Sequence, residues 1–361
     1  MSRELSQSYS RREFIGGGLV LAAAALGLPA TAFGAADRTK QNVPRTEDLD
    51  VYMPTWLTAD EYGKLQNLKL QNVSRFILAF AIPEPDGRIA LPAISSDLKN
   101  LLAANSSHTK VGLSIGGWGG SNAQHAANLQ GWGAALNNPK TFVESANKTV
   151  QRLGIDSFDL DIEFPTAHQA GGPLTKLTQQ LREGLPADVR IAIAVSSNLI
   201  SNPNIRNYQF GENGLAVDDL HVMTYDENGG IGHQPSGYVA SGQWTIDCVG
   251  EWVKRVGDPG KIKVGYPTYG YIYTGATKVG ETYKSSREVL YPQAPASAIN
   301  NNYRELTTTG KVGKDGWGSF MSPSIIHATQ ERIIGAYPDI GGAFLWSAEG
   351  LIQSDLNALA Q

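Results

Sequence analysis

The chain has 361 residues, of which 41% are hydrophobic and 18% are charged, an ordinary balance for a globular protein with a large core. Its net charge of −4 provides no broad basic surface, which argues against nucleic-acid binding. The single cysteine, Cys248, excludes an intramolecular disulfide, and the six histidines are scattered without the Cys/His spacing of a metal site. We therefore expect neither a metal ion nor another cofactor.

The first 36 residues resemble an export signal. Residues 10–15, Ser-Arg-Arg-Glu-Phe-Ile, are similar to the twin-arginine motif, and an apolar run over residues 16–28 follows, then small residues up to Ala36. The run is shorter than a membrane span requires. We predict a twin-arginine-type signal over residues 1–36, with a retained amphipathic anchor as the alternative. Such a signal implies a bacterial protein that is secreted or periplasmic and leaves the membrane once the signal is removed.

After a polar linker, residues 37–49, short apolar strands alternate with amphipathic helices. Strands are predicted at 51–53, 76–81, 111–115, 156–163, 190–195, 219–225, 261–265 and 342–346. Helices are predicted at 58–68, 95–104, 140–153, 174–185, 244–256, 324–336 and 354–360. Eight strands in this alternation predict an α/β fold, a (β/α)8 TIM barrel that occupies residues 50–361 as one catalytic domain.

The alternative is an open, doubly wound sheet, which would need a glycine-rich nucleotide-binding turn after an early strand. The glycine-rich segment 116–120 lacks that spacing and follows the third strand, so the barrel is favoured. Residues 271–320, rich in Thr, Gly and Tyr, predict a short and β-rich insertion between the seventh strand and the seventh helix.

The fourth predicted strand, Asp156-Ser-Phe-Asp-Leu-Asp-Ile-Glu163, is unusually acidic. Side chains alternate between the faces of a strand, so Asp159, Asp161 and Glu163 share one face at spacings of about 7 Å. Burying a row of like charges is costly unless the carboxyls share protons or have partners, and a solvated face is the alternative. Pro165 cannot continue a central strand, which predicts Glu163 at its carboxyl end, where barrels carry their chemistry.

Five strand ends resemble, in order, the motifs of glycoside hydrolase family eighteen, the chitinases and their relatives. The acidic strand is similar to the family's D-x-x-D-x-D-x-E. The other four similarities are Ser114–Gly117 to S-x-G-G, Met223–Asp226 to M-x-Y-D, Gly265–Gly270 to G-x-P-x-Y-G, and Gly341–Trp346 to the eighth strand with its terminal Trp.

The resemblance implies hydrolysis with retained configuration, in which the 2-acetamido oxygen of the sugar attacks its own anomeric carbon. It implies that Glu163 is the general acid and that Asp161 binds the acetamido N–H. Asp159 then shares a proton with Asp161, and Tyr225 donates to the acetamido carbonyl. The implied substrate-binding residues are Asp226, Trp346, Trp118, Tyr52, Ser114, Met223 and Tyr269, with plain core packing as the alternative for the aromatic side chains.

The function that follows is a secreted, monomeric, endo-acting hydrolase of β-1,4-linked N-acetylglucosamine in chitin or its oligosaccharides. Residues 223–227 also resemble the M-T-Y-D-E of bacterial spore-cortex and wall-lytic members, so peptidoglycan remains an alternative polymer, as does the core of an N-linked glycan. A carbohydrate-binding lectin on an inactive barrel is the alternative of another class. Glu163 argues against it, because lectin members of the family typically lose the acid.

Overall fold

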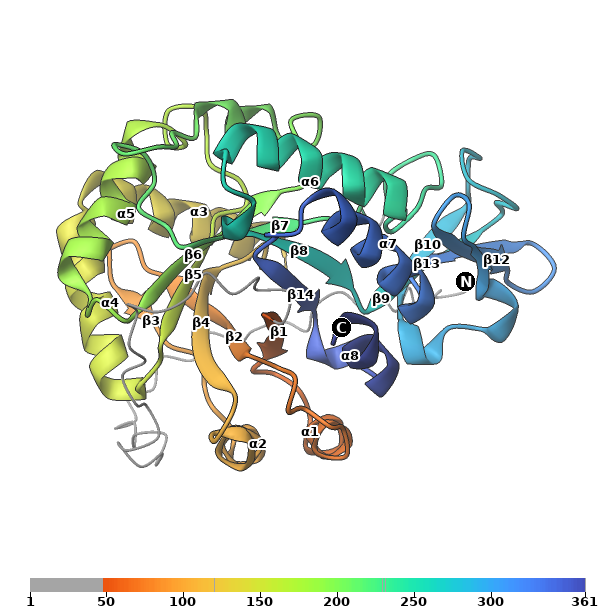
Figure 1. Ribbon diagram of the computed structural model, residues 1–361, viewed down its shortest axis with the longest axis horizontal. Coiled ribbons are helices and arrows are strands. Elements are labelled where there is room, and N and C mark those ends of the chain that lie inside the picture. The colour runs from red at the N-terminus through yellow and green to blue at the C-terminus, as the bar shows by residue number, and fades with distance from the viewer. Residues whose placement is uncertain (1–47, 120, 229, 231, 361) are drawn as a thin grey trace, which may run out of the picture.

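In the computed structural model, which describes residues 48–360 apart from 120, 229 and 231, eight parallel strands close into a barrel (Figure 1). The first barrel strand pairs with both the second and the last, which completes the ring. The barrel strands are β1 (Leu49–Pro54), β2 (Arg75–Pro83), β4 (Lys110–Gly116), β5 (Ser157–Asp161), β6 (Arg190–Ser196), β7 (Asp219–Met223), β8 (Ile262–Pro267) and β14 (Gly342–Trp346). The predicted (β/α)8 barrel is confirmed, while the predicted export signal lies outside the described residues.

Helices surround the barrel and bury their apolar faces against the strands (Figure 1). They are α1 (Ala59–Gln66), α2 (Ser96–Asn105), α3 (Asn122–Asn137), α4 (Pro139–Leu153), α5 (Gly172–Gly184), α6 (Gly242–Val256), α7 (Pro323–Ala336) and α8 (Gln353–Leu359). Between β6 and β7 a single 3-10 turn, Pro203–Asn207, stands in place of a helix. No helix in the described part of the chain has the length and apolar character that a membrane crossing requires.

Helix α3 is the one long helix that the apolar pattern failed to predict. Few of its residues are large and apolar, and Trp132 and Leu136 are the main side chains that it buries. Gly131 stands in the middle of it because a Cβ there would lie 1.7 Å from the carbonyl oxygen of Pro83. Close contact with the β2 backbone thus takes the place of a regular apolar stripe.

Chemical signals in the sequence fix several helix ends. Thr58 accepts a hydrogen bond from the Glu61 amide, and Glu61 accepts one from the Thr58 amide at 2.7 Å, which begins α1. Ser95 caps α2 in the same way from its side chain. Helix α4 ends at Gly154, which adopts a left-handed conformation with φ of 64° that a residue with a Cβ rarely adopts.

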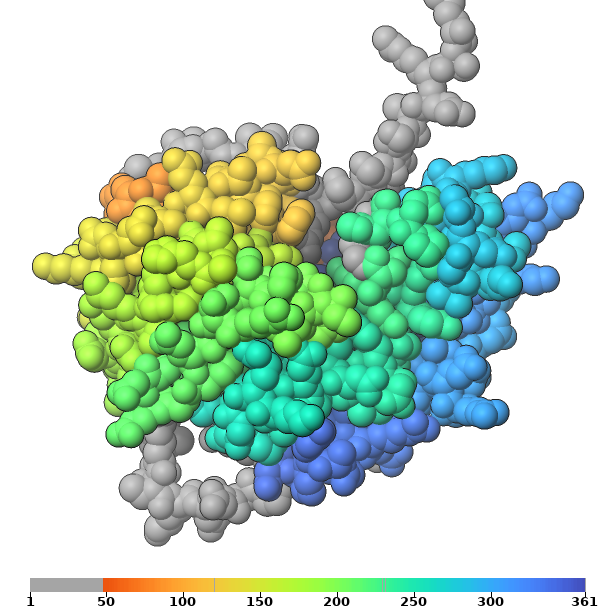
Figure 2. Space-filling model, turned by 90° about the horizontal axis from the view of Figure 1, so that it is seen from above, coloured from red at the N-terminus to blue at the C-terminus, as the bar shows by residue number. Residues whose placement is uncertain are grey.

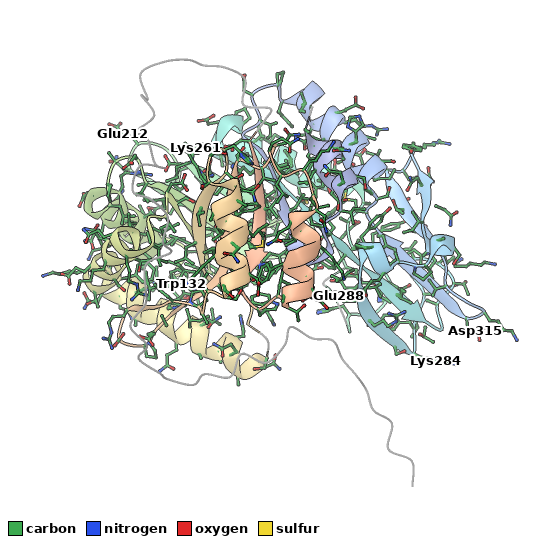
Figure 3. The ribbon with its side chains drawn as sticks, turned by 90° about the horizontal axis from the view of Figure 1, so that it is seen from below. Trp132, Glu212, Lys261, Lys284, Glu288 and Asp315 are labelled. Atoms are coloured by element: carbon green, nitrogen blue, oxygen red, sulfur yellow. The ribbon has the colours of Figure 1, made fainter. Side chains whose placement is uncertain are left out.

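The insertion is a five-stranded antiparallel sheet that begins two residues after β8. Its strands are β9 (Tyr269–Thr274), β10 (Ser285–Leu290), β11 (Asn300–Asn302), β12 (Thr307–Lys311) and β13 (Gly316–Phe320). It projects from one side of the barrel, and in Figure 2 its blue surface forms one end of the molecule. Lys284 and Asp315 lie at its outer edge (Figure 3). A small hairpin strand, β3 (Ile89–Ala90), pairs with the end of β2.

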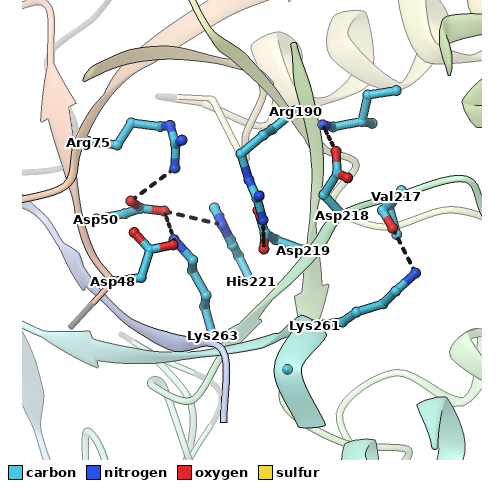
Figure 4. Close-up of polar contacts among 12 residues, drawn as sticks. Asp48, Asp50, Arg75, Arg190, Val217, Asp218, Asp219, His221, Lys261 and Lys263 are labelled. Carbon is cyan, nitrogen blue, oxygen red and sulfur yellow. Dashed lines mark hydrogen bonds and ion pairs between the residues drawn. The ribbon is translucent and has the colours of Figure 1, made fainter. Parts of the chain in front are cut away.

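A buried ionic cluster occupies the amino-terminal ends of the barrel strands (Figure 4). Lys263 of β8 is fully buried, and its Nζ lies 2.5 Å from Asp50 Oδ2 and 3.1 Å from Asp48 Oδ2. Arg75 contacts the other oxygen of Asp50 at 3.3 Å and forms a two-pronged contact with Asp156. Burial lowers the pKa of Lys263, but the two aspartates more than offset this, so that the net shift is upward. The cluster therefore holds the lysine as a cation at the base of the barrel.

Candidate active site

Strand β5 carries its apolar side chains outward and its acidic ones inward. Phe158 and Leu160 belong to the core between the strands and the helices. Asp159 instead contacts side chains from the neighbouring strand β4 and, across the barrel interior, from β1. Asp156, of the opposite parity, pairs with Arg75 at the other end of the strand. The predicted alternation of faces therefore holds for the acidic residues that lie on the strand itself, Asp159 and Asp161.

Glu163 lies beyond the strand rather than on it, which corrects the predicted range of 156–163. The ladder with β4 and β6 ends at Asp161, which pairs with Gly116 and Ala194. The amide of Gly117, the first residue after β4, donates to the Asp161 carbonyl, and the ladder between these strands ends there. Glu163 is half-buried, next to the exposed Phe164. Its carboxyl is thus carried by the loop at the open end of the barrel, above Asp161.

Asp159 is buried beneath this loop and held by hydroxyl groups. Tyr52 donates to its Oδ2 at 2.8 Å and Ser114 donates to the same oxygen at 2.7 Å. Burial raises the pKa of Asp159, although the two hydroxyls and the nearby His221 act in the opposite direction. The net shift of this pKa is upward, toward the neutral form of the carboxyl.

The glycine pair after Ser114 lets two segments of backbone meet under the site. Gly116 has φ of 106°, and a Cβ there would lie 2.2 Å from the Asp161 carbonyl oxygen. A Cβ on Gly117 would lie 2.7 Å from the ring of Phe80. The side chain of Asn128, on α3, donates to the carbonyl oxygens of both glycines at 3.2 and 3.0 Å. These contacts are a physical reason for the S-x-G-G motif.

Aromatic rings surround the mouth of the barrel. Trp346, at the end of β14, is half-buried and lies 5.4 Å from the ring of Tyr52 and 5.5 Å from that of Phe80, centroid to centroid. Phe80 in turn contacts Trp56. Met223 is half-buried in the same cluster. Phe80 was not predicted as a site residue, because nothing in its uniformly apolar strand distinguishes the inward side chains.

On the side of β7 and β8, a group of tyrosines surrounds Asp226. Tyr225 is half-buried, with its ring 6.4 Å from that of Tyr269. Asp226 has a left-handed backbone, with φ of 59°, and its Oδ1 accepts hydrogen bonds from Tyr269 at 2.6 Å and from Tyr271. Tyr271 was missed, although alternation along residues 269–273 places it on the same strand face as Tyr269.

Trp118 lies in the loop after β4, with 39% of its surface exposed. Its ring stacks on that of His125, at a centroid distance of 4.0 Å and an interplanar angle of 18°. This contact holds the indole at the surface, where a flat apolar face suits a sugar ring. This loop follows the strand that bears Ser114, four residues before Trp118.

His221 of β7 is a buried neighbour of Asp159 that the sequence interpretation left out. Its Nδ1 lies 2.8 Å from the Tyr52 hydroxyl and 3.7 Å from Asp159 Oδ1. Burial lowers its pKa to about 4, so the imidazole is neutral at ordinary pH. Strand alternation could have found it, because His221 has the same parity as Met223 and Tyr225.

The site is thus a set of carboxyls, hydroxyls and aromatic rings. Within the described residues, no group of three or more His, Cys, Asp or Glu side chains is arranged to hold a metal ion. Such a set can donate and accept protons and can stack on sugar rings. All eleven residues predicted for the site lie at or beyond the middle of a barrel strand, or within three residues of its carboxyl-terminal end. Tyr269, two residues after β8, is also the first residue of β9.

The sequence and the fold were compared with those of known proteins. A family described as Glycosyl hydrolases family 18 matches residues 49–350. Chitinase 1 of Aphanocladium album is 27% identical over 199 residues, which cover 51% of this chain and 46% of that protein. The chain spans less than half the length of the curated relatives that it matches.

Solved structures share the fold at low identity. A chitinase from Chromobacterium violaceum ATCC 12472 superposes with a TM-score of 0.69 at 17% identity, covering 87% of this chain and 98% of that one. The Bacillus megaterium QM B1551 spore cortex-lytic enzyme SleL superposes with a TM-score of 0.67 at 16% identity, covering 88% and 74%. Because the family match spans nearly all of the described residues and includes every motif of the site, the chain belongs to the family 18 glycosyl hydrolases.

Proposed function

We propose that this protein hydrolyses β-1,4-linked N-acetylglucosamine polymers, with chitin as the substrate, and retains the configuration at the anomeric carbon. The observation that carries the proposal is the carboxyl series of β5. Asp159 is buried and held by Tyr52 and Ser114, Asp161 ends the strand, and Glu163 follows in the half-buried loop at the barrel mouth. Three carboxyls at increasing exposure suit three different protonation tasks.

In the proposed reaction, Glu163 gives its proton to the glycosidic oxygen as the bond to the anomeric carbon breaks. The acetamido oxygen of the same sugar attacks that carbon and forms an oxazolinium ion, while Asp161 accepts a hydrogen bond from the acetamido N–H. Tyr225 donates to the acetamido oxygen and orients it. Water then attacks the anomeric carbon and gives a proton back to Glu163, which restores the acid.

The remaining predicted residues take binding roles in this proposal. Trp346 lies under the reacting sugar, supported by Tyr52 and Phe80. Asp226, fixed by two tyrosine hydroxyls, is suited to accept a hydrogen bond from a sugar hydroxyl. Trp118 provides a stacking surface on the leaving-group side. We also propose that the enzyme is a monomer and that it is exported, as its amino-terminal sequence suggests.

Chitin is favoured as the polymer by the names of the relatives, which include Chitinase 1 of Aphanocladium album and the Chromobacterium violaceum chitinase. Peptidoglycan is the second candidate. It is favoured by the M-T-Y-D-E segment at residues 223–227 and by the fold similarity to a spore cortex-lytic enzyme. The lectin alternative is favoured by the fold similarity to a chitinase-like agglutinin from Robinia pseudoacacia, whereas an N-linked glycan core has no further observation in its favour.

The test is incubation of the purified mature protein with chitin oligomers and, separately, with peptidoglycan, followed by mass spectrometry of the products. We expect chitin oligomers to be cut into shorter oligomers with new reducing ends. Cleavage of peptidoglycan alone would replace chitin by the second candidate. Tight binding of either polymer without any cleavage would favour the lectin and overturn the proposal.

A further inference from the structure

The buried hydroxyl of Tyr52 stands between two titratable groups. Its oxygen lies 2.8 Å from Asp159 Oδ2 and 2.8 Å from Nδ1 of His221. All three side chains are at most 2% exposed, and they come from β1, β5 and β7. No element contributes two of them, so the contact depends on closure of the barrel.

Counting hydrogens limits the states of this trio. Each contact at 2.8 Å requires one hydrogen between its two heavy atoms, because two lone pairs facing each other would repel. Tyr52 supplies one hydrogen for the two contacts. The second must come from a protonated Asp159 or from Nδ1 of His221. The protonation of the aspartate is therefore tied to the proton position on the histidine.

From this geometry we propose that His221 is a positioning residue that holds one proton in common with Asp159 through the hydroxyl of Tyr52. The effect of this exchange on the reaction rests on the proposed function. The exchange itself does not depend on that function. In one state the Asp159 carboxyl donates to Tyr52, and Tyr52 donates to Nδ1. In the other state the Asp159 proton has passed to Tyr52 and the original Tyr52 proton to Nδ1, while Nε2 has released its own proton to water, so that the imidazole stays neutral and the trio has lost one proton.

Burial lowers the pKa of His221, and the charged groups that face it act in both directions. Asp50 Oδ2, on β1, lies 3.6 Å from Nε2, which has no hydrogen-bond partner among the described residues (Figure 4). Asp219 on β7 and Asp159 on β5 also favour a proton on the ring, whereas Lys263 on β8 and Arg75 on β2 oppose it. The ring of Phe344 on β14 also lies against the imidazole, at a centroid distance of 5.2 Å.

The consequence for the reaction is a second place for the proton of the buried aspartate. When that proton sits on Asp159, the neighbouring Asp161 can be ionised at little cost. When Asp159 is ionised, Nδ1 carries the hydrogen and donates it to Tyr52, which in turn donates to the carboxylate. From its buried position in the barrel interior, His221 thus influences the proton affinity of the aspartates without contacting the sugar.

The direct test is the nitrogen NMR spectrum of the histidine rings in the uniformly labelled mature protein, recorded between pH 5 and 9. His221→Asn identifies the signal; if that variant does not fold, single replacement of each of the other five histidines identifies it by elimination. We expect Nδ1 without hydrogen at low pH and with hydrogen at high pH. In Asp159→Asn, whose amide donates permanently to Tyr52, Nδ1 should stay without hydrogen throughout.

Tyr52→Phe removes the bridge and should abolish the response of Nδ1 to pH. The same Nδ1 state at every pH in the wild type, or an unchanged response in Tyr52→Phe, would overturn the proton sharing. These measurements need no substrate, so they decide the inference even if the protein cleaves neither polymer.

The kinetic arm measures kcat and KM on chitin oligomers across the same pH range. In His221→Asn, the limb of the kcat profile that belongs to the aspartates should move to higher pH by about one unit, a tenfold change in proton affinity. KM should change less than kcat. His327→Asn, on α7, is the matched control and should leave the profile unchanged. A uniform loss of activity without a shifted limb would show that His221 serves only the stability of the barrel.

Discussion

Among single residues, Glu163 is the side chain on which the proposed reaction depends most. Glu163→Gln keeps the shape and removes the proton donor, so kcat on chitin oligomers should fall by roughly 10²–10⁴-fold or more. The matched control is Glu212→Gln, an exposed carboxyl, which should keep the parent rate. Wild-type activity in Glu163→Gln would remove Glu163 from the role of general acid.

The neighbours of Glu163 bear on the identity of the nucleophile. A retaining enzyme with its own nucleophile needs two carboxyls about 5 Å apart across the scissile bond. Asp161 lies next to Glu163 along one chain segment, and Asp226 is held by Tyr269 and Tyr271. Both arrangements favour the acetamido group of the substrate as the nucleophile.

Substrates with a plain 2-hydroxyl should therefore not turn over, and a thiazoline mimic of the oxazolinium ion should inhibit competitively. Initial rates on cellulose and chitin oligomers of equal length, with and without the thiazoline, check this expectation. Comparable rates on both oligomers, with no inhibition, would turn attention to Asp226 as the nucleophile.

Among the elements, helix α8 contains a buried acid that makes stability depend on pH. Asp355 Oδ2 accepts a hydrogen bond from the Ile352 amide at 3.0 Å. Burial raises the pKa of Asp355 to about 7, and the amide contact acts weakly in the other direction. The folded protein therefore keeps this proton between about pH 4 and pH 7, whereas the unfolded chain has lost it.

This acid contributes stability that is fully present below about pH 4 and is lost as the pH rises through about 7. Asp355→Asn keeps the acceptor oxygen and cannot ionise. The difference in the free energy of unfolding between wild type and variant should thus change by up to about 4 kcal/mol across this range, and level off above it. Urea unfolding at a series of pH values measures it; a difference that does not vary with pH would contradict the raised pKa.

At the scale of the whole molecule, the twin-arginine segment predicts that the barrel is exported in its folded state. Replacing Arg11 and Arg12 together by Lys keeps the charge and removes the paired guanidinium groups. The precursor should then remain in the cytoplasm of a bacterial host, as measured by immunoblots of cell fractions. The control is Arg3→Lys, which lies outside the motif and should not affect export. Normal export of the double variant would leave a general secretory signal as the explanation.

The order of elements and most of the site were predictable from the sequence alone, because they depend on local patterns. Apolar runs of five or six residues predict the barrel strands, and alternation on β5 separates Asp159 and Asp161 from Phe158 and Leu160. Cap residues such as Thr58 and Gly154 mark helix ends, since they act on their own backbone. The resemblance to the family then supplied roles that alternation by itself cannot supply.

Contacts between strands far apart in the chain were decided only by the tertiary structure. The end of β5 at Asp161 depends on where its neighbours β4 and β6 stop pairing, so Glu163 falls in a loop. Helix α3 is specified by the close approach of Gly131 to the β2 backbone rather than by an apolar stripe. His221 meets Tyr52 across 169 positions of sequence, and its role depends on a hydroxyl that serves two neighbours. Sequence periodicity predicts the strand face on which a side chain lies. Closure of the barrel determines which side chains from other strands it contacts there.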